Sequence, residues 1–188
     1  MKNIVIFASG SGTNAEAIIK HFQNNSRVKV ALVISNNTSA FVLERAKKYG
    51  VETLVFNRQK LNETEMVDEA LRERNIDFIV LAGFMLLFPK RLIKKFPNKI
   101  LNIHPALLPK YGGKGMYGMH VHEAVVKNKE KESGITIHLV NENYDEGEIV
   151  FQAKCTVNAA DSADDVASKI HVLEHEHYPK IIEEQLTK

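Results

Sequence analysis

An amide and an imidazole stand two residues apart near the middle of this chain. The stretch from Lys99 to Gly113 reads KILNIHPALLPKYGG, in which an apolar run ends in Asn102 and His104 before a proline. Side chains alternate along a strand, so these two side chains are expected on one face. Burying them without partners would cost about 1–3 kcal/mol for each unsatisfied group. They are therefore either satisfied structurally or they face a cleft.

An acidic turn further along the chain supplies a carboxylate for this pair. The segment NYDEG (143–147) carries Asp145 between two apolar runs. A carboxylate beside His104 would favour the charged ring and raise its pKa. Together with the amide of Asn102, such a pair suits oxyanion stabilisation and proton transfer, which is acyl-transfer chemistry. A capped histidine beside a structural asparagine fits the same spacing, so both interpretations stay open here.

The first turn of the chain, ASGSGTNAEA, has the composition of an anion site. Gly10 and Gly12 allow a tight strand-to-helix turn, and the free N–H groups of a helix start can hold an anion. Thr13 and Asn14 add side-chain donors. The second expected strand ends in SNN (35–37), without the acidic residue that binds a ribose diol, and Gly-Lys-Ser/Thr is absent. A mononucleotide-type phosphate is the better fit.

Histidines near the end of the chain raise a different hypothesis. His171, Glu174 and His175 match the His-x-x-Glu-His pattern of some zinc hydrolases, and the two histidines would share a helix face. Such a site needs a further ligand, and a mixed polar helix face is the plainer expectation. His120 and His122 stand two apart at an expected helix start, so they would not share a face or complete a metal site.

These residues must be positioned by an alternation of strands and helices. Strands are expected at 2–8, 28–35, 51–56, 77–84 and 98–104, and helices at 12–25, 39–50 and 62–75, with Ser39 as an N-cap and Gly50 as a stop. Apolar strands spaced by helices predict a parallel sheet covered on both faces. The runs 133–141 and 147–157 predict an antiparallel hairpin, and a helix is expected at 162–184. The fold class is therefore α/β, a three-layer sandwich with a mixed, mainly parallel sheet and a Rossmann-like N-terminal half.

Length and composition limit the number of domains and the possible classes of protein. The 188 residues predict one domain, 1–188, and a net charge of +2 does not suggest a nucleic-acid partner. The single cysteine, Cys155, excludes an intramolecular disulfide and a cysteine-cluster metal site. Apolar runs fall short of the ~18 residues of a membrane span. We therefore expect a cytoplasmic enzyme acting on small molecules, as a monomer or weak homodimer, with a non-catalytic nucleotide-binding module as the alternative.

The motifs taken together resemble a known family. NIHPALLPKY, preceded by LAGFM (81–85) and combined with the SGSGTN and DEG turns, is similar to the phosphoribosylglycinamide formyltransferases, within the wider group of folate-dependent formyltransferases. The resemblance runs from residue 2 to about 185. It implies transfer of a formyl group from 10-formyltetrahydrofolate to the amine of glycinamide ribonucleotide in de novo purine synthesis, with no metal. Rival members are other 10-formyltetrahydrofolate-dependent transferases and a hydrolase, which normally carry a further domain.

The resemblance also implies roles for individual residues. Asn102 would donate to the formyl oxygen, His104 would act as general acid, and Asp145 would orient His104 and raise its pKa. The residues implied for the ribonucleotide are Gly12, Thr13, Asn14 and Glu174. The residues implied for the folate are Arg58, Met85, Leu86, Leu87, Phe88, Asn102, Asn141, Glu142, Asn143, Tyr144 and Asp145.

Two stretches depart from the family pattern. Leu86 stands where the family often has arginine. The segment KYGGKGMYGMHVHEAV (110–125) is several residues longer than the shorter family form, and it flanks the Asn-x-His motif. We expect the longest loop, the coil-rich segment from Pro105 to Met119, to border the site.

Overall fold

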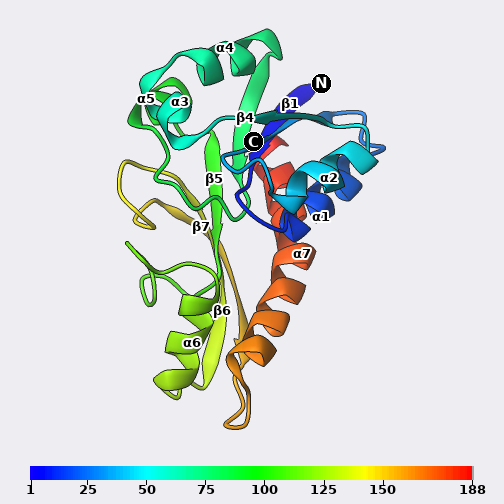
Figure 1. Cartoon of the computed structure of the whole chain (residues 1–188). Coiled ribbons are helices and arrows are strands. Elements are labelled where there is room, and N and C mark those ends of the chain that lie inside the picture. Colours follow the sequence, from blue (N-terminus) through cyan, green and yellow to red (C-terminus); the bar gives the residue numbers. More distant parts are fainter. Residues whose placement is uncertain (188) are drawn as a thin grey trace.

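A seven-stranded mixed sheet forms the centre of the computed structural model, which describes residues 1–187 (Figure 1). The strand order is β3-β2-β1-β4-β5-β6-β7, and the first five strands run parallel while β6 is antiparallel to both neighbours. The predicted mixed, mainly parallel sheet is therefore confirmed. The strands are β1 (Lys2–Phe7), β2 (Val28–Ser35), β3 (Glu52–Val55), β4 (Ile76–Leu81), β5 (Ile100–His104), β6 (Glu132–Leu139) and β7 (Ile149–Thr156).

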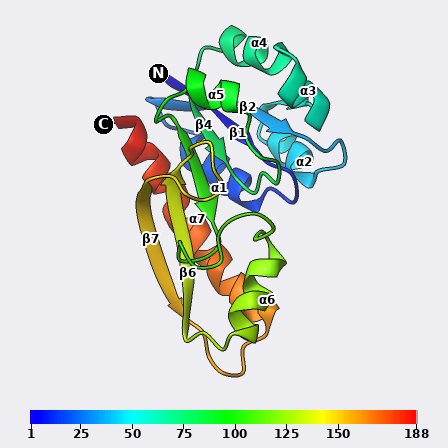
Figure 2. The same ribbon diagram turned by 90° about the vertical axis from the view of Figure 1, so that its left-hand side faces the viewer.

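Helices cover both faces of this sheet, as Figures 1 and 2 show. One face packs against α1 (Thr13–Phe22), α2 (Phe41–Lys48), α6 (Met119–Lys127) and α7 (Ala163–Thr187). The opposite face packs against α3 (Arg58–Glu63), α4 (Met66–Glu73) and α5 (Lys90–Lys95). Two hydrophobic cores result, one on each side, so the three-layer sandwich is confirmed.

Strand β1 shows why its sequence is almost continuously apolar. Ile4 and Ile6 belong to the core beneath α1 and α7, whereas Val5 and Phe7 belong to the core beneath α4 and α5. All four side chains are fully buried. A strand buried on both faces cannot show the alternation of a half-exposed one, because each face needs apolar side chains.

Three local expectations need correction. The helix expected at 62–75 is interrupted: α3 ends at Glu63 and α4 begins at Met66. The break lies at Thr64, which is extended and whose hydroxyl donates to the Lys60 carbonyl at 2.7 Å. Ser39 is not an N-cap; Ala40 holds that position, and the Ser39 N–H donates to Asn37 Oδ1 instead. The short helix α5 was not expected. Gly50 does follow the end of α2, with φ +69°.

Helix α7 links the end of the chain to the middle of the sheet. The Ser162 and Asp165 side chains each bond to the other's backbone N–H, a reciprocal cap at the start of the helix. The buried Tyr178 hydroxyl lies 2.9 Å from the Leu81 carbonyl and 3.0 Å from the Leu101 carbonyl. These contacts fix α7 beneath the end of β4 and the start of β5, one turn beyond Glu174.

Candidate active site

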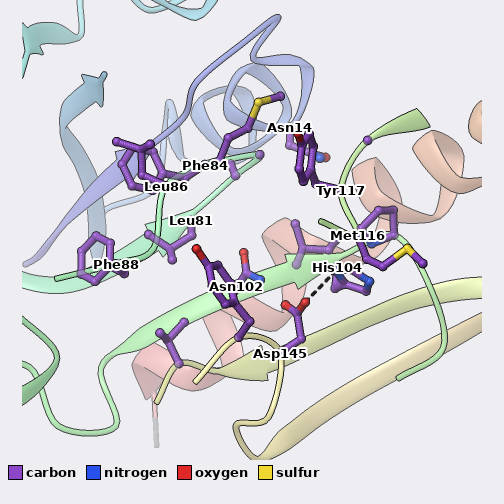
Figure 3. Close-up of a pocket in the computed structure, with 18 of the residues that line it drawn as sticks. Asn14, Leu81, Phe84, Leu86, Phe88, Asn102, His104, Met116, Tyr117 and Asp145 are labelled. Atoms are coloured by element: carbon purple, nitrogen blue, oxygen red, sulfur yellow. Dashed lines mark ion pairs between the residues drawn. The ribbon is translucent and has the colours of Figure 1, made fainter. Parts of the chain in front are cut away.

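A cavity of about 560 Å³ lies at the carboxyl ends of β1, β4 and β5. Strand β1 has β2 on one side and β4 on the other, so the order of strands reverses direction here. Open α/β sheets bind ligands at such a point. The walls come from the first turn, the segment after β4, the end of β5, the loop before α6, the β6–β7 turn and α7. Figure 3 shows side chains from these segments converging on the cavity.

The three residues predicted to carry catalysis meet in this cavity. Asn102 and His104 come from β5, and Asp145 comes from the β6–β7 turn. His104 Nδ1 lies 3.6 Å from Asp145 Oδ2, the pair joined by the dashed line in Figure 3. Asp145 has φ +55°, which a non-glycine residue rarely adopts, and its Oδ2 accepts the Gly113 N–H at 2.9 Å. The turn therefore directs this carboxylate at the imidazole.

Hydrogen bonding shows which ring nitrogen of His104 carries a proton. Its Nε2 lies 2.7 Å from the Tyr111 carbonyl oxygen, which can only accept, so Nε2 carries a proton and donates it. Nδ1 is then the nitrogen that faces Asp145. Burial lowers the pKa of His104, while Asp145 and the Tyr111 carbonyl act to raise it without offsetting the burial. The expectation that the net pKa of His104 is raised is therefore wrong, because the residue is only 3% exposed.

Asp145 remains ionised beside this ring. Burial raises its pKa, but His138, His104 and the Gly113 N–H together more than offset that effect, so the pKa of Asp145 lies below its ordinary value. A charged carboxylate therefore stands next to a largely neutral imidazole. Any proton that reaches His104 Nδ1 is stabilised by this charge.

His138, which sequence analysis missed, orients the amide of Asn102. Its Nδ1 lies 2.9 Å from the Leu139 carbonyl, which can only accept, so Nδ1 donates. Its Nε2 lies 3.6 Å from Asp145 Oδ1 and 3.1 Å from the amide nitrogen of Asn102, whose N–H it accepts in the neutral ring. Asn102 lines the cavity, and its second N–H is left free to donate there. The strand register places His138 directly opposite Asn102. The sequence hints at this residue because it places a histidine inside the apolar run that forms β6.

The first turn forms one side of the cavity. Gly12 has φ +75° and precedes α1, whose first residues are Thr13 and Asn14. Asn14 Nδ2 donates to Glu174 Oε2 at 2.9 Å, and within residues 1–187 the buried Asn14 Oδ1 has no partner. Burial raises the pKa of Glu174, and neither Asn14 nor His171 offsets it. All four predicted ribonucleotide residues therefore line one side of the cavity.

The opposite side is apolar. Phe84 packs edge-on against Phe7 and Phe88, with ring centroids 5.4 and 6.2 Å apart, and Figure 3 shows Leu81, Phe84, Leu86 and Phe88 gathered there. The predicted folate residues that line the cavity are Met85, Leu86, Leu87, Phe88, Asn102, Asn141, Asn143, Tyr144 and Asp145. Arg58 and Glu142 are not among the lining residues. Arg58 is exposed on α3, and Glu142 pairs with Lys90 at 2.9 Å.

The remaining histidines differ in their surroundings. His122 is buried against the cavity, and its Nδ1 has no partner in the described chain. Burial, then His171 and His104, lower the pKa of His122 to about 4. His120 is exposed, with its Nδ1 3.6 Å from Glu123 Oε2. Sequence spacing could not show whether His120 or His122 borders the site, because this depends on which of them is buried.

The zinc pattern of α7 does not assemble a metal site. The rings of His171 and His175 stack with centroids 6.2 Å apart, while Glu174 turns away to Asn14. Among the side chains that the structure describes, no group of three His, Cys, Asp or Glu residues is placed to hold a metal ion. The geometry thus gives the zinc-hydrolase alternative no support.

The cavity thus brings an amide, a histidine and a carboxylate together between the first turn and an apolar slot, which suits acyl-transfer chemistry. The family described as formyl transferase matches residues 2–182, and the chain belongs to that family. The resemblance drawn from the motifs is confirmed by relatives named phosphoribosylglycinamide formyltransferase. The Arabidopsis thaliana chloroplastic protein is 39% identical over 96% of this chain, and the Escherichia coli protein is 37% identical over 96% of this chain and 85% of its own length.

Solved structures agree with these relatives. A phosphoribosylglycinamide formyltransferase from Bacillus halodurans is 36% identical, with a TM-score of 0.87 over 100% of this chain and 96% of its own. The chain spans 64% of the Arabidopsis relative and 60% of the relative from Vigna unguiculata.

Proposed function

We propose that this protein transfers the formyl group of 10-formyltetrahydrofolate to the amine of glycinamide ribonucleotide. The products are formylglycinamide ribonucleotide and tetrahydrofolate, and the reaction belongs to de novo purine biosynthesis. The observation that carries the proposal is the convergence of Asn102, His104 and Asp145 between the first turn and the apolar slot. The names of the relatives at 34–39% identity support the same reaction.

The site residues would act on the reaction as follows. The substrate amine attacks the formyl carbon, and the formyl oxygen becomes an oxyanion that accepts the free N–H of Asn102. The amine loses a proton to His104 Nδ1, which faces the Asp145 carboxylate. The carbon–nitrogen bond to the folate then breaks, and His104 returns this proton to the leaving nitrogen as general acid. Protein groups supply each step, so the proposed reaction needs no metal.

The two substrates would occupy opposite sides of the cavity. The ribonucleotide phosphate would bind at Gly12, Thr13 and Asn14, where the start of α1 offers N–H groups, and Glu174 would contact the ribonucleotide. The pterin ring of the folate would enter the apolar slot after β4. Arg58 stays a prediction as a contact of the folate tail, and Glu142 stays a prediction as a residue of the pterin slot.

Partners and location are part of the same proposal. Across residues 1–187, no helix is both long enough and apolar enough to span a membrane. A cytoplasmic location and a monomer or weak homodimer stay predictions, and the two plant relatives are named chloroplastic.

A spectrophotometric assay tests the reaction directly. Purified protein is mixed with 10-formyltetrahydrofolate and glycinamide ribonucleotide, and each is omitted in turn. We expect turnover only when both are present. Turnover without the ribonucleotide would indicate a hydrolase, and absence of turnover with both would contradict the proposal. Activity that is lost on chelation and restored by zinc would instead support the His171–His175 alternative.

A further inference from the structure

Three consecutive loop residues, Tyr111 to Gly113, touch both members of the His104–Asp145 pair. The Tyr111 carbonyl accepts the His104 Nε2–H at 2.7 Å, and the Gly113 N–H donates to Asp145 Oδ2 at 2.9 Å. One short piece of backbone therefore holds the imidazole from one side and the carboxylate from the other. A displacement of this segment would change the distance and the angle between the two groups together.

The backbone of this segment is unusual. Tyr111 has φ +56° and Gly113 has φ +91°. A Cβ at Gly112 would stand 2.5 Å from Leu108 Cδ2 and 3.4 Å from Asp145 Cβ, so a larger residue here would displace the Leu108 side chain. A non-glycine residue keeps a left-handed conformation only where its surroundings hold it there. The side chain of Tyr111 must therefore be anchored.

The anchor lies on the side of Tyr111 away from the catalytic pair. The Tyr111 hydroxyl donates to Glu130 Oε1 at 2.9 Å and accepts the Asn128 Nδ2–H at 2.9 Å. Asn128 caps the end of α6, and Glu130 follows it before β6. Lys110 Nζ pairs with Glu130 at 3.0 Å, but the Lys110 side chain is 67% exposed and makes no hydrogen bond or ion pair with His104. The phenol, the amide and the carboxylate thus form a hydrogen-bonded anchor outside the cavity.

We infer that Tyr111, Asn128 and Glu130 are positioning residues for His104. They hold the Tyr111 carbonyl against Nε2, which keeps the Nε2 proton in place and leaves Nδ1 as the nitrogen that exchanges the reaction's proton beside Asp145. This inference rests on the proposed function, because it assigns the reactive nitrogen of that site. None of the three side chains lines the cavity, so they act through the loop backbone.

The test removes the anchor while keeping the ring. Tyr111→Phe deletes the hydroxyl that binds Glu130 and Asn128. We expect kcat to fall about tenfold or more, since small misplacement of a catalytic group is costly, with KM for both substrates unchanged. Because the hydrogen bond to the Tyr111 carbonyl raises the pKa of His104, the acid limb of the pH–rate profile should move to lower pH. Nitrogen-15 NMR of the His104 ring should show less of the Nε2-protonated form.

Two further variants make the test specific. Glu130→Ala should reproduce the effects of Tyr111→Phe, whereas Glu130→Gln keeps an acceptor for the phenol and should restore most of the activity. Lys110→Met removes the exposed ion pair alone and should match the parent in kcat and in the His104 titration. Urea unfolding confirms that each variant is folded, and Glu130→Ala replaces Tyr111→Phe if the latter does not fold.

The outcomes separate this inference from the proposed function. A parent-like His104 titration and tautomer in folded Tyr111→Phe and Glu130→Ala would overturn the inference, even if activity fell. Equal effects of Lys110→Met and Glu130→Ala would also overturn it. The NMR measurement needs no substrate. If the parent protein showed no formyl transfer, the proposed function would be contradicted, and the titration and tautomer of the His104 ring would still decide this inference.

Discussion

Asn102 offers one directed hydrogen bond to the cavity. His138 takes one amide N–H, which fixes the orientation of the side chain and leaves the other N–H for a developing oxyanion. We expect Asn102→Ala to lower kcat by ~10²–10³-fold, the usual loss of one oxyanion donor, with the KM values little changed. Steady-state kinetics on both substrates measures this. Turnover within a few-fold of the parent would remove Asn102 from the mechanism.

Asp145 supplies the charge that partly offsets the burial of His104. Asp145→Asn keeps the size of the side chain but removes this charge, so the pKa of His104 should fall further below its ordinary value. Turnover should drop severely, because a proton on Nδ1 loses its stabilising partner. An NMR titration of the His104 ring in both proteins measures the change. An unchanged titration would show that the two groups are not coupled.

At the scale of elements, the two glycines of the first turn both line the cavity but differ in how closely they pack. A Cβ at Gly12 would stand 2.4 Å from the Val42 side chain and 2.7 Å from its Cα, and φ is +75°. We expect Gly12→Ala to lower the free energy of unfolding by about 1–3 kcal/mol, because α1 and α2 must shift and the backbone is strained. Urea unfolding measures this loss.

Gly10 is the matched position in the same turn. Across the described residues, no atom lies within 4 Å of a Cβ built at Gly10. Gly10→Ala should therefore change the free energy of unfolding by less than about 0.5 kcal/mol. It should weaken binding of the ribonucleotide more than binding of the folate, because Gly10 lines the cavity beside the proposed phosphate site at Gly12, Thr13 and Asn14. Calorimetry with each ligand decides, and equal losses would contradict a phosphate site here.

The sequence predicted most elements because their patterns are local. Apolar strands such as β1 and β2 and the amphipathic helix α1 are visible without tertiary contacts. The expectations failed where a single side chain redirected the backbone, as the Thr64 hydroxyl does at the end of α3. Helix α5, KRLIKK, is one and a half turns long and mostly polar, so its periodicity is too short to detect.

For the whole molecule, the site depends on contacts between distant segments. Strand alternation placed Asn102 and His104 together, but their partners Tyr111 and His138 follow from the loop path and the strand register. The direction of the net His104 pKa shift could not be predicted, because burial is a property of the assembled fold. For the same reason, the sequence could not show that His122 is buried and His120 is exposed.

Burial of His122 should make the stability of the whole molecule depend on pH. Its pKa is about 4 in the folded protein, below the ordinary value of 6.5. The unfolded chain therefore binds a proton that the folded protein does not, between these two values. The resulting stability is fully present above pH 6.5 and is lost as pH falls toward about 4, by up to about 3 kcal/mol.

The measurement is urea unfolding of the parent and of two variants on α6 across this range of pH. The carboxylates with lowered pKa and the buried His104 also weaken the fold at low pH, so only the difference between proteins isolates His122. His122→Leu removes the titrating ring and its unpartnered nitrogen, and its free energy of unfolding should fall less steeply with pH than that of the parent. His120→Leu, at an exposed position two residues earlier, should keep the parent's slope. Identical slopes in all three proteins would show that His122 is not held neutral in the folded state.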